Sequence, residues 1–192
     1  MVYSQINANK RKSILLLGLF FLILMTLGYI FGYISQFGTF FGLAFGFIFS
    51  LISALISYYF GDKIVLSTSG AKEINKSQYN VLFDIVENLS LGTGIPMPKI
   101  YVIQDNSINA FATGRDPNHA SVAVTTGSLN KLNKEELEGV LAHEISHITN
   151  YDIRLMVLVS VMVGTIVMLS DFFLRSFMFR DSEDKGKGNI II

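Results

Sequence analysis

Residues 138–152 read Glu-Gly-Val-Leu-Ala-His-Glu-Ile-Ser-His-Ile-Thr-Asn-Tyr-Asp, a stretch that contains two of the three histidines of the chain. His143 and His147 stand four positions apart, and Glu144 directly follows the first of them. Four residues are about one turn of an α-helix, so both imidazoles project from one face and can reach the same metal ion. We therefore expect a helix on which His143 and His147 are metal ligands.

The residues around this motif favour a helix. Asn133 and Glu136 form a capping pattern that would begin a helix at Lys134 and carry it to about Thr149. An apolar stripe lies beside the histidine face: Leu137, Leu141, Ile145 and Ile148. The alternative is a surface helix with two unrelated histidines. With only three His in 192 residues, chance formation of the motif is on the order of 0.1%.

Glu144 has a different expected task from the two histidines. One position beyond a ligand, its carboxylate can face a water on the metal without binding the metal itself. Zinc lowers the pKa of such a water, so that hydroxide is available at neutral pH. Glu144 is then the expected general base, which takes the water's proton and passes it to the leaving amine.

Upstream of the motif, the pattern is mixed α and β. A helical stripe runs over Ser77–Leu91 and is expected to end at Gly92. Lys99–Gln104 and Ala120–Thr125 are rich in Val, Ile and Thr, as strands are. Arg115–Asn118 lies between them and is predicted as a turn.

The N-terminal third has the composition of membrane helices. Ser13–Gly61 holds 49 residues without one charge, and charged residues make up only 16% of the chain. One crossing needs about 20 residues, so two spans are expected, at about Ser13–Ile34 and Phe37–Phe60. The turn between them is placed at Ser35-Gln36, the most polar point.

Small residues recur along both spans. They are Gly28 and Gly32 in the first, and Gly38, Gly42, Gly46, Ser50 and Ala54 in the second. Such stripes let helix backbones approach closely inside a membrane, so we expect either a tight hairpin or contact with another span. The plain alternative is the general abundance of Gly in membrane helices.

Charge distribution suggests an orientation. Lys10, Arg11 and Lys12 precede the first span, so the positive-inside rule places the N-terminus in the cytoplasm, and two crossings return the chain there. Zero net charge gives no indication of nucleic-acid binding, and the absence of Cys excludes disulfides, thiolate catalysis and Cys-ligated zinc. A third apolar run follows the motif helix, interrupted by Asp171, for which we expect a pair with Arg175.

The expected fold class is an α+β membrane protein. Residues 1–61 are expected to hold the N-terminal segment and two transmembrane helices, and residues 62–154 an incomplete cytosolic metalloprotease domain. Residues 155–179 are expected to form a third hydrophobic helix, and residues 180–192 a polar tail.

These motifs resemble a known family. The run at 138–152 is similar to the active-site helix of the HtpX heat-shock proteases, which share a family with the CAAX prenyl endopeptidases. Asn109-Ala-Phe-Ala-Thr-Gly114 and Val122-Ala-Val-Thr-Thr-Gly127 resemble two further family segments, and the paired spans match the family layout. The resemblance covers nearly the whole chain from about residue 10.

The resemblance implies a zincin-like (gluzincin) fold, with a transmembrane hairpin before it and a hydrophobic helix after it. It also implies one Zn²⁺ per active site, protein or peptide substrates, and quality control of membrane proteins in the cell membrane under stress. Substrate backbone would add along an edge strand. Either Asn109, Ala110, Phe111 and Ala112, or Val122–Thr125, would supply that edge. Asp152 is either an acceptor that orients an imidazole or an exposed helix-end residue.

One part of the family pattern is missing. A catalytic zinc needs three protein ligands, and the family's third is a Glu on a later helix that the sequence to Ile192 does not contain. We therefore expect an N-terminal portion of such a protease, with weak zinc binding and little or no proteolysis of its own. One rival hypothesis is a non-catalytic membrane protein that keeps the fold. Another is a small transporter or channel subunit, but that hypothesis leaves the His pair unexplained.

Overall fold

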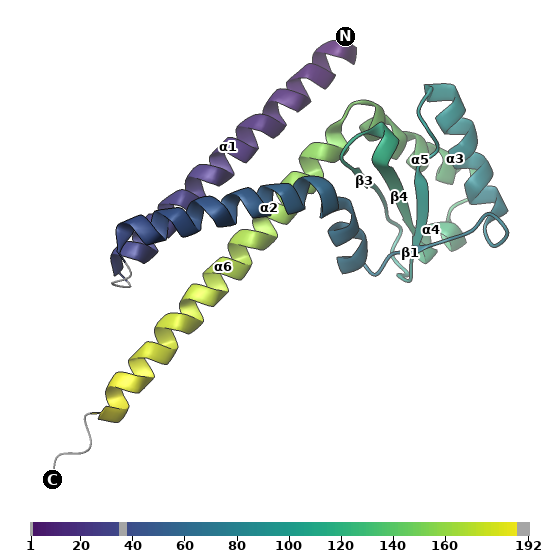
Figure 1. The fold of residues 1–192 in the computed structure, drawn as a ribbon. Helices are drawn as coiled ribbons and strands as arrows, with labels where there is room; N and C mark the ends of the chain where they lie inside the picture. The colour runs from purple at the N-terminus through teal and green to yellow at the C-terminus, as the bar shows by residue number, and fades with distance from the viewer. Residues whose placement is uncertain (1, 35–37, 188–192) are drawn as a thin grey trace.

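The computed structural model describes the backbone of residues 2–34 and 38–187, with side chains for 6–34, 38–171 and 175. Long helices leave one side of a small α+β domain (Figure 1). In chain order the elements are α1 (Val2–Ile34), α2 (Thr39–Thr68), β1 (Lys72–Glu73), α3 (Asn80–Thr93), β2 (Lys99–Ile103), β3 (Ala110–Gly114), the 3₁₀ turn η1 (Pro117–His119), β4 (Ala120–Thr125), α4 (Thr126–Lys131), α5 (Lys134–Thr149) and α6 (Asp152–Lys187).

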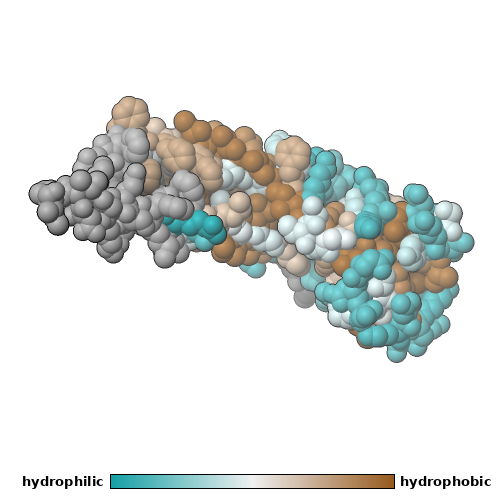
Figure 2. All heavy atoms as spheres, turned by 90° about the horizontal axis from the view of Figure 1, so that it is seen from below, coloured by the Kyte–Doolittle hydropathy of each residue, from teal (hydrophilic) through white to brown (hydrophobic). Residues whose placement is uncertain are grey.

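Within the described ranges, three helices are long and apolar enough to cross a membrane: Ile6–Ile34, Thr39–Thr68 and Asp152–Asp171. Hydrophobic surface covers these helices, and hydrophilic surface covers much of the domain (Figure 2). The predicted fold class, an α+β membrane protein with an N-terminal helical pair and a later apolar helix, is confirmed. The first two helices extend beyond the expected outer ends, and the predicted turn at Ser35-Gln36 lies outside the described residues.

The predicted close packing at the glycines is confirmed, and the two helices that it joins are α1 and α2. A Cβ atom added to Gly28 would lie 2.5 Å from the carbonyl oxygen of Gly42 and 3.0 Å from the Cα of Gly46. One added to Gly32 would lie 2.9 Å from the Cα of Gly42. The two backbones therefore touch directly, which only residues without a side chain permit.

A valine at position 42 should separate these helices. Its Cβ would strike backbone atoms of Gly28 and Gly32, which cannot rotate away. Overpacking of this kind costs about 1–3 kcal/mol of unfolding free energy. Gly18→Val is the matched control, because a Cβ at Gly18 meets nothing within 4 Å. Unfolding of both variants by SDS in mixed micelles, followed by circular dichroism, checks the prediction, and equal losses would contradict it.

The third long helix differs from expectation at its C-terminal end. The expected pair forms, with Asp171 Oδ2 accepting from Arg175 Nε at 3.0 Å. Helix α6 continues to Lys187, so residues 180–187 of the expected polar tail have helical backbone.

The four strands lie in the order β1-β2-β4-β3. β4 pairs in parallel with β2 on one side and antiparallel with β3 on the other, and all six of its residues are buried. The proposal that Val122–Thr125 supplies a binding edge is therefore wrong, because both of its hydrogen-bonding sides are occupied. β3 is the edge strand next to α5, with Ala112 opposite Val122.

Helices α3 and α5 pack against each other beside this sheet. The predicted stripe of α5 is buried, and its bounds and capping box are as expected: Asn133 Oδ1 accepts from Glu136 N at 2.8 Å, and Glu136 Oε2 accepts from Asn133 N at 2.9 Å. Helix α3 ends at Thr93, not before Gly92. Gly94, at φ 71°, forms the left-handed cap that Gly92 was expected to provide.

Candidate metal and catalytic site

Helix α5 brings the two histidines of the motif together. The Nε2 atoms of His143 and His147 lie 3.2 Å apart, and the ring planes are nearly perpendicular, at 81°. Two nitrogens bound to one tetrahedral zinc at ordinary bond lengths are about 3.3 Å apart. The pair therefore fits two positions of a zinc coordination sphere without rearrangement. Among the described residues, no cluster of three or more His, Cys, Asp or Glu side chains could hold a metal.

Glu144 is half-buried and reaches the edge strand. Its Oε2 accepts a hydrogen bond from the backbone N–H of Ala112 at 3.1 Å. The carboxylate thus links the helix that carries the histidines to the edge strand β3.

The pairing of β3 shows which backbone groups face outward. Asn109 O accepts from Thr125 N at 3.0 Å, so the backbone of Asn109 faces β4 in a hydrogen-bonded pair with Thr125. Because such pairs alternate in antiparallel sheets, the N–H and C=O groups of Ala110 and Ala112 point away from β4. Exposure falls along the strand, from exposed Asn109 through half-buried Ala110 and Phe111 to buried Ala112.

Two buried hydroxyls fix the start of this edge strand. Ser128 Oγ accepts from Asn109 N and donates to Asn109 O, both at 2.8 Å, and Thr125 Oγ1 accepts from the same N–H at 3.1 Å. Gly127 packs on backbone atoms of Asn106 and Ser107, where a Cβ would clash. Sequence reasoning missed Ser128 and Thr125 as anchors. The Thr-x-x-Ser spacing by which Thr125 caps α4 was the available signal.

Asp152 is half-buried and bonded, so of its two expected roles the exposed helix-end residue is not what the structure shows. It begins α6, and its Oδ2 lies 3.0 Å from His147 Nδ1. The Nδ2 of Asn9, on α1, donates to Asp152 Oδ1 and, at 3.1 Å, to the carbonyl of Asn150. Asn9 was also missed, because a single Asn before an apolar run has no spacing that would mark it.

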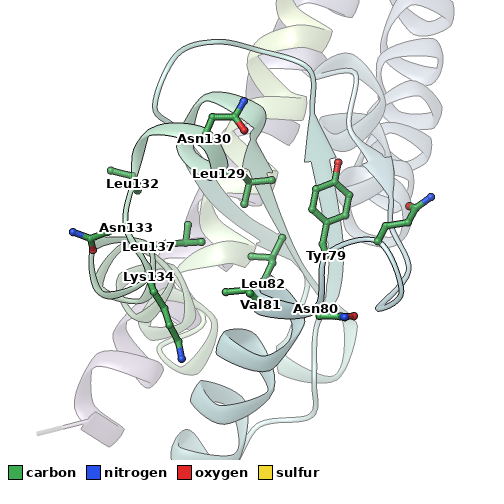
Figure 3. Close-up of a pocket in the computed structure, with 11 residues that line it drawn as sticks. Tyr79, Asn80, Val81, Leu82, Leu129, Asn130, Leu132, Asn133, Lys134 and Leu137 are labelled. Atoms are coloured by element: carbon green, nitrogen blue, oxygen red, sulfur yellow. The ribbon is translucent and has the colours of Figure 1, made fainter.

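Other polar and hollow features lie apart from this cluster. His119 is exposed, and its Nδ1 lies 2.7 Å from Asp116 Oδ1. A hollow of about 430 Å³ lies between the start of α3 and the α4–α5 turn, and Tyr79, Leu129 and Leu137 are among the residues that line it (Figure 3). Its lining contains neither the His pair nor Glu144.

Comparison with known proteins gives consistent matches. The sequence pattern of Peptidase family M48 matches residues 76–191. A protein named Protease HtpX homolog from Thermoanaerobacter pseudethanolicus is 45% identical over 192 residues, which cover 96% of this chain and 64% of that protein. One from Caldanaerobacter subterraneus subsp. tengcongensis is 47% identical over 175 residues, covering 91% and 58%.

Two further matches are less extensive. A Protease HtpX homolog from Dictyoglomus turgidum is 49% identical over 135 residues, covering 70% of this chain and 44% of that protein. The crystal structure of S. mikatae Ste24p matches with a TM-score of 0.45 and 22% identity, covering 88% of this chain and 39% of that one. The chain thus spans roughly three-fifths of the first two curated relatives that it matches.

Proposed function

The chain belongs to peptidase family M48, and from that premise we propose a membrane-bound zinc endopeptidase that hydrolyses peptide bonds of misfolded or membrane proteins. The observation that carries the proposal is the convergence of His143 and His147, 3.2 Å apart at Nε2, beside a carboxylate bonded to an edge strand. A structural helix has no need of this arrangement.

His143 and His147 are the proposed ligands, through their Nε2 atoms. Zinc bound there would supply Lewis acidity toward a water and toward the scissile carbonyl. The third ligand is expected to be the family's Glu, from the part of the relatives' length that this chain does not span. An anionic third ligand adds affinity and fixes the geometry of the other two.

Glu144 is the proposed general base and acid. Its carboxylate takes one proton from the attacking water and later gives it to the nitrogen of the leaving amine, so that the carboxylate is regenerated. The hydrogen bond from Ala112 N holds the carboxylate in place before substrate arrives. This bond also ties the position of the base to the position of the edge strand.

Asn109–Ala112 is the proposed binding edge for substrate backbone. The outward N–H and C=O groups of Ala110 can pair with an added strand, because no strand among the described residues pairs with that side of β3. Strand addition recognises backbone and is tolerant of side chains, which suits a protease that acts on many unfolded segments.

The site lies at the end of a membrane-spanning segment. His147 contacts Asp152, the first residue of the third candidate span. A peptide bond that reaches the histidines would therefore lie close to the membrane surface. This position supports membrane proteins, or segments emerging from the membrane, as substrates.

Removal of zinc should abolish cleavage. A form with the length of the relatives should degrade casein, lose this activity with 1,10-phenanthroline, and regain it with added Zn²⁺. The 192-residue chain should keep little zinc after dialysis and cleave little or nothing. Full cleavage in the presence of the chelator would contradict a zinc mechanism. Equal zinc retention and cleavage by both forms would show that residues 1–192 contain a third ligand.

A non-catalytic membrane protein is the second candidate. The observation that favours it is that the described residues contain no three-ligand cluster. The casein experiment separates the two candidates, since this alternative predicts no chelator-sensitive cleavage in the longer form.

The domain is proposed to face the cytoplasm, because basic residues cluster before the first span. A single Cys introduced at Asn118, which is exposed, suits a chain without other cysteines. In intact cells it should resist a membrane-impermeant maleimide and react after permeabilisation. A Cys introduced at exposed Gly92, in the same domain, should behave identically. Labelling of either site in intact cells would reverse the orientation.

A further inference from the structure

The junction between α5 and α6 has an uncommon backbone. Helix α5 ends at Thr149 with Asn150 as its C-cap, Tyr151 has φ 62°, and Asp152 begins α6. A positive φ in an aromatic residue is strained and persists only where surrounding contacts hold it. This single residue turns the chain so that Asp152 lies against His147, five positions earlier.

The N-terminal membrane helix supplies those contacts. Asn9 is 8% exposed, and its amide Nδ2 donates both to the carbonyl of Asn150 and to Asp152 Oδ1. The next residue, Lys10, places its ammonium 4.5 Å from the centre of the Tyr151 ring. Residues 9 and 10 therefore hold all three residues of the junction, from a position 141 residues earlier in the chain.

The two oxygens of Asp152 have separate partners. Asn9 donates to Oδ1, while Oδ2 lies 3.0 Å from His147 Nδ1. A carboxylate held at one oxygen keeps the other in a fixed direction, and an ionised carboxylate can only accept hydrogen bonds. His147 must then carry its proton on Nδ1, which leaves the lone pair of Nε2 directed toward His143, 3.2 Å away.

We propose that Asn9 is a positioning residue for the proposed metal site: it orients Asp152, and through Asp152 it fixes the tautomer and direction of His147. The inference rests on the proposed function, but the tautomer of His147 can be observed without metal or substrate. It makes α1 part of the site's supporting structure as well as an anchor. Loss of a residue that orients a metal ligand by hydrogen bonding typically weakens metal binding by about 10–100-fold.

The tautomer can be read directly, because the chain contains only three His. In ¹⁵N-histidine-labelled chain in lipid nanodiscs, at a pH where the imidazoles are neutral, the signals of His147 are those that disappear in His147→Gln. The wild type should show the Nδ1–H form alone, and Asn9→Ala should give a mixture with the Nε2–H form. In the form with the length of the relatives, Co²⁺ binding, followed by its visible bands, should weaken about 10–100-fold in Asn9→Ala.

Asn7→Ala is the matched control, since Asn7 is an exposed asparagine on the same helix. It should leave both readouts unchanged. Asn9→Asp should perturb both, because it places a second carboxylate against Asp152. Adding Asp152→Asn should restore them, because the new amide donates to the new carboxylate and still accepts from His147 Nδ1.

A purely structural tie between α1 and the domain predicts a different pattern. If Asn9→Ala keeps the helical content, the Nδ1–H form and the Co²⁺ affinity of the wild type, the proposal is overturned. It is equally overturned if the wild type itself shows the Nε2–H form, or if the double substitution restores nothing. Failure of the longer form to cleave casein would refute the protease proposal and leave the tautomer result standing.

Discussion

Replacing His143 or His147 with alanine should abolish both zinc retention and proteolysis in a form with the length of the relatives. Each substitution removes one of two nitrogens that converge to 3.2 Å, and the remaining ligands cannot hold the ion in a fixed geometry. Because zinc supplies several kcal/mol of stabilisation to the reaction, we expect kcat/KM to fall by at least about 10³-fold.

His119→Ala is the control for these two variants. His119 is exposed and bonded to Asp116, so its loss should leave zinc content and cleavage at the wild-type level. For each variant, bound zinc after dialysis is measured by mass spectrometry, and casein cleavage is measured on the same preparation. A His147→Ala protein that keeps one zinc per chain and cleaves normally would remove His147 from the site.

Replacing Glu144 with glutamine should separate binding from turnover. The side chain keeps its size but can no longer take a proton, so zinc should be retained while kcat falls by about 10²–10⁴-fold. Glu138→Gln is the matched control, because Glu138 lies on the same helix and is exposed. Normal cleavage by Glu144→Gln would refute its role as the base, and loss of its zinc would indicate that Glu144 is itself a ligand.

The features that the sequence predicted well are those set by local spacing. The capping box of Asn133 and Glu136 and the apolar stripe of α5 act within one helix, so their pattern is complete in the sequence. The glycine stripes predicted close packing for a similar reason, because a helix face without side chains lets another backbone approach inside a membrane. The convergence of the His pair follows from helix geometry alone.

The features that were missed or wrong depend on contacts distant in sequence. Whether Asn109–Ala112 or Val122–Thr125 forms the edge depends on strand order, which periodicity does not record. The link from Asn9 to Asp152 joins residues 143 positions apart. At the end of α3, two glycines compete, and Gly94 is the one whose backbone takes the left-handed conformation.

The central claim is that His143 and His147 together hold one zinc ion, and X-ray absorption at the zinc edge tests it most directly. In the form with the length of the relatives, the scattering around zinc should show two imidazole ligands at about 2.0–2.1 Å. His119→Gln should show the same two imidazoles, and His147→Gln should retain no zinc. Two imidazoles remaining in His147→Gln, or none in the wild type, would contradict the account.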